Sequence, residues 1–359
     1  MFPFLVAVAA ALATDPDLPS EPARLASHSL LLDIAAAGSR YVTVGERGQI
    51  LVSSDRGQSW MQSLTPTQAL LTGVCFFDAQ RGIAVGHDEV ILVTADGGQT
   101  WTKAHYAPQS QQPLLDVWCG SGAGHAIAIG AYGVYFVSTD GGNTWDEKKM
   151  QAIAPVAPAA HDAHVAQSTP RPDTDDGSAG GFHLNAIAAD ASGRLYVAAE
   201  AGHLYRSGDG GSTWTALPSP YSGSFFGVLP IAGDTVLAFG LRGNLFRSED
   251  AGLTWARVMT GTEAMLDAGV VAGPAAMPGD AATLRNPATL GDPEVVVVGL
   301  SGAILLSRDG GRSFSVSQQA DRKGIAAALV GDGALITVGE GGVKVVSLSA
   351  GMARGGSRP

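Results

Sequence analysis

The sequence of 359 residues is poor in charged side chains and contains no basic cluster. Charged residues make up 15% of the chain, and the formal net charge is −11. A nucleic-acid-binding surface needs clustered lysine and arginine, because binding depends on the release of counterions from the phosphates. The composition therefore argues against a nucleic-acid partner.

Long hydrophobic runs are also lacking beyond the first residues. The segment 1–13 is apolar and ends in Ala11-Leu12-Ala13, the pattern of a signal-peptide core followed by an A-x-A cleavage site, although no basic residue precedes it. The run is too short to cross a bilayer as a helix. We therefore predict a signal peptide over 1–13, a linker over 14–21, and a soluble mature protein that is periplasmic or secreted.

Cysteine is scarce as well. The chain has two cysteines, Cys75 and Cys119, too few for the disulfide framework of a small secreted domain. Each fills a strand position that Ile34 and Leu229 occupy in other repeats, which predicts two small, buried, apolar side chains. A disulfide between neighbouring blades is the alternative, and it requires closely spaced Cα atoms.

Glycine, by contrast, is abundant, with 48 residues, and it recurs at fixed positions of an internal repeat. Six times the chain reads hydroxyl residue, any residue, Asp, any residue, Gly, any residue, hydroxyl residue, aromatic residue. The Asp and aromatic residues of the six copies are Asp55 and Trp60, Asp96 and Trp101, Asp140 and Trp145, Asp209 and Trp214, Asp250 and Trp255, and Asp309 and Phe314. We interpret the pattern as a structural turn whose Asp caps loop N–H groups, because an active site needs one copy and not six.

A hairpin precedes each copy, bracketed by two small residues such as Gly45 and Gly48, where we expect glycine to supply a positive φ. A seventh hairpin over 335–346 lacks the Asp. Each unit contains four short strands and recurs every 41 to 44 residues where no insertion intervenes. The repeat predicts an all-β, seven-bladed β-propeller of four-stranded antiparallel blades over 22–349. We expect residues 22–29 to supply the outer strand of blade seven and so remove an open edge.

Two insertions, at about 151–181 and 273–293, interrupt the repeat, and residues 350–359 are predicted to form a flexible tail. The first insertion contains His161 and His164 in a segment rich in Ala, Pro, Ser and Asp. That composition favours disorder, and two histidines on a flexible loop bind metal weakly. We therefore predict neither a metal site nor a cofactor.

The six copies identify the repeat as similar to the Asp-box, or bacterial neuraminidase, repeat. The segment 130–145 resembles most closely the photosystem II stability/assembly factor-like propellers, and the resemblance covers 22–349. Members of that family are exported seven-bladed propellers without known catalysis, and the photosynthetic ones assist the assembly of a membrane complex. The resemblance implies a non-catalytic scaffold that binds a protein partner, at a membrane protein complex or transporter.

Enzymatic alternatives are weaker. Sialidases share the Asp box, but their Arg-Ile-Pro segment is absent here. A glycoside hydrolase with paired carboxylates, or a glycan-binding propeller, remains the alternative. Asp33, Asp116 and Asp267 share one predicted position on the innermost strands, and we interpret them as polar lining of the axis more readily than as a catalytic set. A purely structural module is a further alternative.

We predict that a partner binds to the hairpins, because the side chains between the bracketing small residues differ from one repeat to the next while the scaffold stays the same. We predict that the hairpins share one face with the loops between blades, and that the Asp boxes lie on the opposite face. The candidate partner-binding residues are Arg47, His87, Asp88, Tyr132, Glu200 and Arg242. Tyr132 is the one aromatic residue among them, which weakens the glycan-binding alternative.

Overall fold

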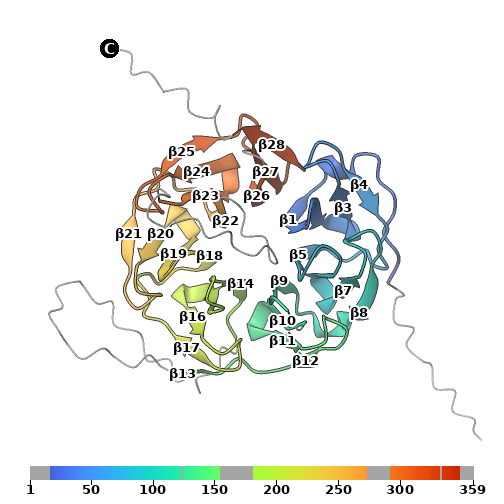
Figure 1. Cartoon of the computed structure of the whole chain (residues 1–359), viewed down its shortest axis with the longest axis horizontal. Coiled ribbons are helices and arrows are strands. Elements are labelled where there is room, and N and C mark those ends of the chain that lie inside the picture. Colours follow the sequence, from blue (N-terminus) through green and yellow to red (C-terminus); the bar gives the residue numbers. More distant parts are fainter. Residues whose placement is uncertain (1–16, 123, 154–180, 273–291, 332–333, 348–359) are drawn as a thin grey trace, which may run out of the picture.

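The computed structural model of the chain describes residues 17–122, 124–153, 181–272, 292–331 and 334–347. Seven sheets form a ring around a central axis, and the chain passes from blade one to blade seven in order around the ring (Figure 1). The predicted all-β, seven-bladed propeller is thus confirmed, with mostly four-stranded antiparallel blades. The segments 1–13 and 350–359 and most of both insertions lie outside the described residues.

The strands of each blade run from the axis outward. Blades one to three contain β1 (Leu31–Ala37), β2 (Arg40–Gly45), β3 (Ile50–Ser53) and β4 (Met61–Ser63); β5 (Leu71–Phe76), β6 (Gly82–Gly86), β7 (Ile91–Thr94) and β8 (Thr102–His105); and β9 (Leu114–Cys119), β10 (Ala126–Gly130), β11 (Tyr135–Ser138) and β12 (Asp146–Glu147). Blade four contains β14 (Leu184–Ala189), β15 (Leu195–Ala199), β16 (Leu204–Ser207) and β17 (Trp214–Ala216), with β13 (Ala152–Ile153) added in parallel to β17.

Blades five and six complete the four-stranded set. They contain β18 (Phe225–Ala232), β19 (Thr235–Gly240), β20 (Leu245–Ser248) and β21 (Ala256–Val258), then β22 (Leu266–Ala272), β23 (Glu294–Gly299), β24 (Ala303–Ser307) and β25 (Ser315–Gln318). Blade seven contains β26 (Ile325–Gly331), β27 (Ala334–Gly339) and β28 (Lys344–Ser347).

The second strand of each blade packs against neighbouring blades on both of its faces. Every residue of β6, β10 and β15 is buried. These strands read as continuous apolar runs because both of their faces pack against neighbouring blades, unlike a strand with one face in water. The core consequently lies between blades: Val42 and Val44 of blade one, for example, share a cluster with Leu71 and Val74 of blade two.

Packing also joins the two ends of the ring, but the predicted outer strand of blade seven is not found. Blade seven has three strands in the described residues, and 22–29 include a short 3-10 turn, η1 (Ala26–His28), instead of a strand. One backbone hydrogen bond links this segment to blade seven, from Val343 N to Ser27 O at 2.9 Å. The preceding residues 20–23 are instead hydrogen-bonded to Gln62 and Thr65 of blade one.

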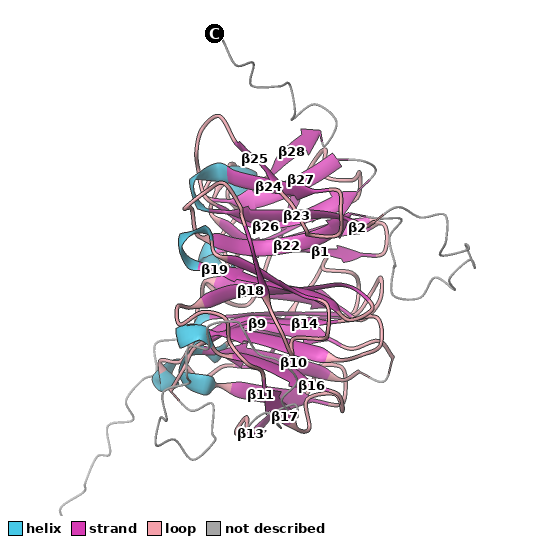
Figure 2. Cartoon of the chain, turned by 90° about the vertical axis from the view of Figure 1, so that its left-hand side faces the viewer, coloured by secondary structure: helices cyan, strands magenta, loops and turns pink. Residues whose placement is uncertain are grey.

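The hairpins between second and third strands lie together on one face. Their tips form 3-10 turns, seen along one side of the molecule in Figure 2. These turns are η2 (Glu46–Gly48), η3 (His87–Glu89), η5 (Ala131–Gly133), η6 (Glu200–Gly202), η7 (Leu241–Gly243) and η9 (Leu300–Gly302). We call this side the hairpin face and the opposite side, which carries the Asp-box loops, the box face.

The two bracketing glycines have different physical roles, which corrects our expectation of a positive φ at both. Gly48 has φ +66°, a conformation that favours glycine. Gly45 is extended, with φ −175°, but a Cβ there would lie 2.1 Å from Leu30 O. The first glycine is therefore required by the close approach of two strands, and the second by backbone conformation.

The two cysteines form a disulfide, so the prediction of two separate buried thiols is wrong. Cys75 on β5 and Cys119 on β9 have Cα atoms 5.7 Å apart. The innermost strands of neighbouring blades converge near the axis, and this brings equivalent residues within the range that a disulfide spans. The bond links blades two and three. Within the described residues, no helix has the length and apolar character that a membrane span requires.

Candidate functional site

The Asp boxes form closed networks of hydrogen bonds in the loops between third and fourth strands. In blade one, Ser53 Oγ and Ser59 N each donate to Asp55 Oδ1, at 2.8 and 2.9 Å. Ser59 Oγ donates to Asp55 Oδ2 at 2.5 Å, and Gly57 N donates to Ser53 Oγ at 2.7 Å. These bonds lower the pKa of Asp55 to about 2, mainly through Ser59. The carboxylate is thus held in its ionised form by its own loop.

The same network recurs in the other boxes. The carboxylates of the remaining five copies accept hydrogen bonds from their own loops, and their pKa values are also lowered; they are Asp96, Asp140, Asp209, Asp250 and Asp309. The aromatic rings differ more than the repeat suggests. Trp101 and Trp214 are buried, whereas the remaining rings are half-buried; these are Trp60, Trp145, Trp255 and Phe314.

Two acidic side chains near the axis connect neighbouring blades. Asp33 accepts hydrogen bonds from Ile34 N and from Val74 N of blade two, both at 2.8 Å. Asp116 in blade three accepts from Val117 N at 2.7 Å and from Ile187 N of blade four at 2.8 Å. Burial, with the nearby charge of Asp116, raises the pKa of Asp33 to about 8, and burial raises that of Asp116 to about 6.

Asp267 does not share the strand position of the other two, which corrects the sequence alignment. Asp33 pairs with Val44, whereas Asp267 lies in the bulge between the paired residues Leu266 and Ala268. A bulge inserts one unpaired residue, and a repeat aligned by eye does not reveal which residue is inserted. Burial raises the pKa of Asp267 to about 7.

The candidate partner-binding residues all lie on the hairpin face. Arg47, Asp88, Tyr132 and Arg242 occupy the tips of their turns with φ between 55° and 59°. Arg47 and Arg242 are exposed, and neither forms an ion pair with another described residue. Left-handed backbone at four tips directs these side chains away from the strands and into solvent.

The remaining candidates differ in their local contacts. His87 is exposed, and the 57% exposed ring of Tyr132 packs edge-on against His183. Glu200 Oε2 accepts a hydrogen bond from His183 N at 3.0 Å. Glu340 accepts in the same way from Gly324 N in blade seven, so Glu200 belongs to a recurring backbone cap as well as to the hairpin face.

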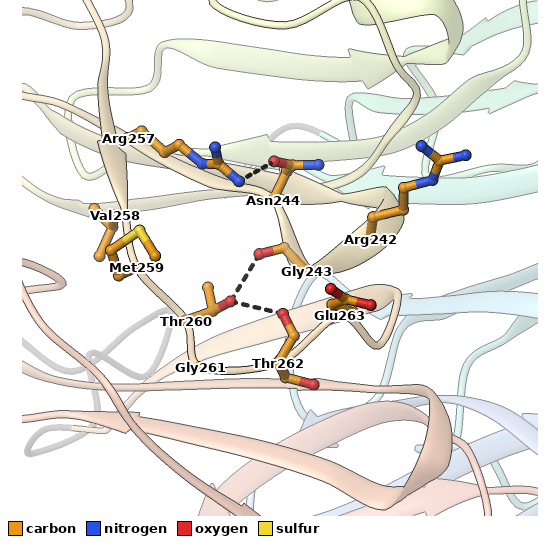
Figure 3. Close-up of a pocket in the computed structure, with 10 residues that line it drawn as sticks. All are labelled: Arg242, Gly243, Asn244, Arg257, Val258, Met259, Thr260, Gly261, Thr262 and Glu263. Atoms are coloured by element: carbon orange, nitrogen blue, oxygen red, sulfur yellow. Dashed lines mark hydrogen bonds between the residues drawn. The ribbon is translucent and has the colours of Figure 1, made fainter.

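A cleft beside Arg242 was not predicted from the sequence. It has a volume of about 740 Å³ and lies at the outer edge of blade five (Figure 3). Its walls are η7, Asn244 just before β20, the end of β21 and the loop 259–263. Its lining residues are separated by up to 21 positions in the sequence, and no motif marks them as a group. Only the pairing of β20 with β21 brings them together.

A second cavity, of about 470 Å³, lies between blades three and four. It is lined by Lys148 and Lys149 on one side and by the Asp-box loop 210–214 on the other. No group of three His, Cys, Asp or Glu side chains with metal-binding geometry occurs in the described part of the chain. The His161–His164 segment lies outside it.

Comparison with known proteins confirms the predicted resemblance. Residues 57–170 match the family model described as photosynthesis system II assembly factor YCF48. The structure titled "YCF48 bound to D1 peptide" superposes with a TM-score of 0.61 at 18% identity, covering 93% of this chain and 97% of that chain. YCF48 from Cyanidioschyzon merolae gives 0.60 at 16% identity, covering 89% and 95%. No curated protein matches the sequence.

An enzyme has the same fold. An ancestral GH74 enzyme superposes with a TM-score of 0.64 at 12% identity, and the match covers 94% of this chain but 46% of that chain. At such low identities the superpositions establish the propeller fold and no more, because one fold supports many functions.

Proposed function

We propose that this protein, with its match to the YCF48 assembly-factor family, is an exported, non-catalytic scaffold that binds a protein partner through the hairpin face, at a membrane complex or transporter. The observation that carries the proposal is the pair of exposed arginines at the tips of η2 and η7. Neither forms an ion pair with another described residue, on a chain of net charge −11. Arginine is enriched at interface hot spots and pairs with acidic groups of a partner.

Two further observations support the proposal. A structurally similar propeller has been solved with the D1 peptide bound, which shows that this fold can hold a peptide. The Cys75–Cys119 disulfide is of the kind that persists in oxidising compartments, in line with export.

A glycoside hydrolase is the second candidate, favoured by the GH74 superposition and by the raised pKa values near the axis. The hydrogen bonds of those carboxylates count against it. Both oxygens of Asp33, and both oxygens of Asp116, accept backbone N–H groups from their own and the next blade. A catalytic pair needs oxygens that face the substrate, so these carboxylates are better suited to joining blades.

The test is co-purification from the native host with variants of the two tip arginines. Arg47→Glu combined with Arg242→Glu should weaken capture of the partner at least tenfold, about 1.4 kcal/mol. Because exposed turn positions contribute little to folding, stability should change by no more than about 0.5 kcal/mol per site.

The matched control is Arg56→Glu with Arg308→Glu. These residues are exposed in the Asp-box loops, and the substitutions change the net charge by the same amount; Arg308 also loses its ion pair with Glu294. If the control pair loses the partner and the hairpin pair retains it, the binding face is the box face and the proposal fails.

A further inference from the structure

The cleft of blade five is built on a frame of hydrogen bonds, and Figure 3 shows the two contacts of this frame that Thr260 makes. Thr260 Oγ1 donates to Gly243 O at 2.8 Å and lies 3.1 Å from Thr262 O. Ala264 N donates to Thr262 Oγ1 at 3.1 Å. The frame fixes the chain that follows β21 against the hairpin turn η7, so the backbone of Thr260 is held in place.

Blade one contains the same frame. Thr65 Oγ1 donates to Gly48 O at 2.8 Å and lies 3.1 Å from Thr67 O. Ala69 N donates to Thr67 Oγ1 at 3.0 Å. Thr65 in blade one is therefore the structural equivalent of Thr260 in blade five.

In blade one this frame is occupied by the protein's own segment 17–23. Ser20 N donates to Thr65 O, and Thr65 N donates to Ser20 Oγ, both at 2.9 Å. The side chain of Gln62 donates to Glu21 O at 2.9 Å and accepts from Ala23 N at 2.8 Å. Ser20 is only 5% exposed, so the contact is a buried one. The segment lies along the outer edge of blade one, where its backbone groups bond to Thr65 and to the side chain of Gln62 without pairing as a strand.

A second outer edge is covered in a similar way, because β13 pairs in parallel with β17 of blade four. In blade five, no described residue forms a hydrogen bond with the amide or the carbonyl of Thr260. The space that segment 17–23 fills in blade one is here the cleft of about 740 Å³. Exposed strand edges with open backbone groups are sites where another chain can pair.

We propose that the cleft of blade five binds an extended segment of a partner polypeptide, in the way that blade one binds residues 17–23. This inference rests on the proposed protein-binding function and locates part of its interface. The amide and carbonyl of Thr260 pair with one residue of the segment, and a Ser or Thr at that place accepts the Thr260 amide as Ser20 accepts that of Thr65.

Residues around the two frames differ between blades one and five, and these differences indicate how the segment bound by blade five differs from residues 17–23. Arg257 stands where blade one has Gln62 and offers donors only, so it favours a carbonyl or an acidic side chain. Arg242 adds a second positive charge to the lining, and Glu263 adds one negative charge. Val316 of blade six, which is 42% exposed, stands where Lys103 of blade two pairs with Asp17. The bound segment therefore has an apolar residue three positions before its Ser or Thr, and an acidic residue after it.

The experiment uses the full-length protein and a fluorescent synthetic peptide, Leu-Leu-Pro-Ser-Glu-Pro-Ala, which is the sequence of 17–23 with leucine in place of the first aspartate. Fluorescence anisotropy should show saturable binding. Arg257→Glu should weaken this binding at least tenfold, whereas Arg47→Glu, in the occupied blade one, should change it less than twofold. A peptide with aspartate restored at the first position should bind more weakly than the leucine peptide, because no cation faces it.

Three results would overturn the inference. They are the absence of saturable binding, equal binding by the Arg257→Glu variant with an unchanged melting temperature, and a dimer in sedimentation that Arg257→Glu dissociates, which would make a second copy the occupant. If Arg257→Glu retains the native partner while the double variant of Arg47 and Arg242 loses it, the hairpin-face function stands and the cleft is not part of the interface.

Discussion

Blades one and five show how the same unit serves two purposes. Both contain a complete Asp box and the threonine frame below the hairpin turn. In blade one the frame is filled by residues 17–23, and the edge becomes part of the folded core. In blade five the frame is open, and the charged residues that line it are Arg242, Arg257 and Glu263. The difference indicates that the same frame contributes to folding where a segment of the chain covers it. Where no segment of the chain covers it, the frame is available to bind a partner.

The largest effect of a single substitution should come from the glycines that both frames share. Gly48 and Gly243 each have φ +66°, and an added Cβ would lie 2.0 Å from the carbonyl oxygen of Thr67 or Thr262. Gly48→Ala and Gly243→Ala should each lower the free energy of unfolding by about 3 kcal/mol, through strained backbone and this clash. Urea denaturation measures both.

The control for the glycines is Gly208→Ala, since nothing lies within 4 Å of a Cβ at that position. If one frame glycine tolerates alanine and the other does not, the two frames are not equivalent.

A further effect on stability is expected from a change of pH, through a residue that differs between blades one and five. Asp33 in blade one has a pKa raised to about 8, and blade five has Gly227 in its place. Between roughly pH 4 and pH 8 the unfolded chain loses this proton while the folded protein keeps it. Stability should therefore fall as pH rises through this range, by up to about 5 kcal/mol, since one pKa unit corresponds to about 1.4 kcal/mol.

The pH dependence is measured as the urea midpoint between pH 5 and pH 8.5. Asp33→Asn cannot titrate and should flatten the slope, even though it lowers stability throughout by leaving one backbone N–H without an acceptor. An unchanged slope in this variant would assign the dependence to other groups. Below pH 4 the lowered pKa values of the Asp boxes give the opposite trend, with stability lost as the carboxylates become protonated.

The smallest effect should come from the covering segment itself. Ser20→Ala removes the acceptor of the buried Thr65 amide and should cost about 1 kcal/mol. Ser54→Ala, at an exposed hydroxyl of the same blade, should cost less. Thermal unfolding compares the two variants. Equal midpoints would show that the bond from the Thr65 amide to the Ser20 hydroxyl adds no stability to blade one.

Much of the architecture was predictable because it repeats. Six boxes and seven hairpins determine the blade number, and the spacing of small residues locates the turns. Apart from the positive φ expected at Gly45, the predictions that were wrong concern single contacts between distant residues. They are the pairing of Cys75 with Cys119, the course of residues 22–29, and the bulge that displaces Asp267.

The sequence by itself determined the fold class, the number of blades and the face on which each group of turns lies, because these follow from periodicity and from local turn chemistry. Tertiary structure alone decided which cysteines meet at the axis, where the N-terminal segment binds, and that blade five has an open cleft beside Arg242. These features depend on distances between blades and on the path of a segment outside the repeat. A repeating pattern contains information about each unit and its neighbour, and none about the segment that covers one unit and leaves another open.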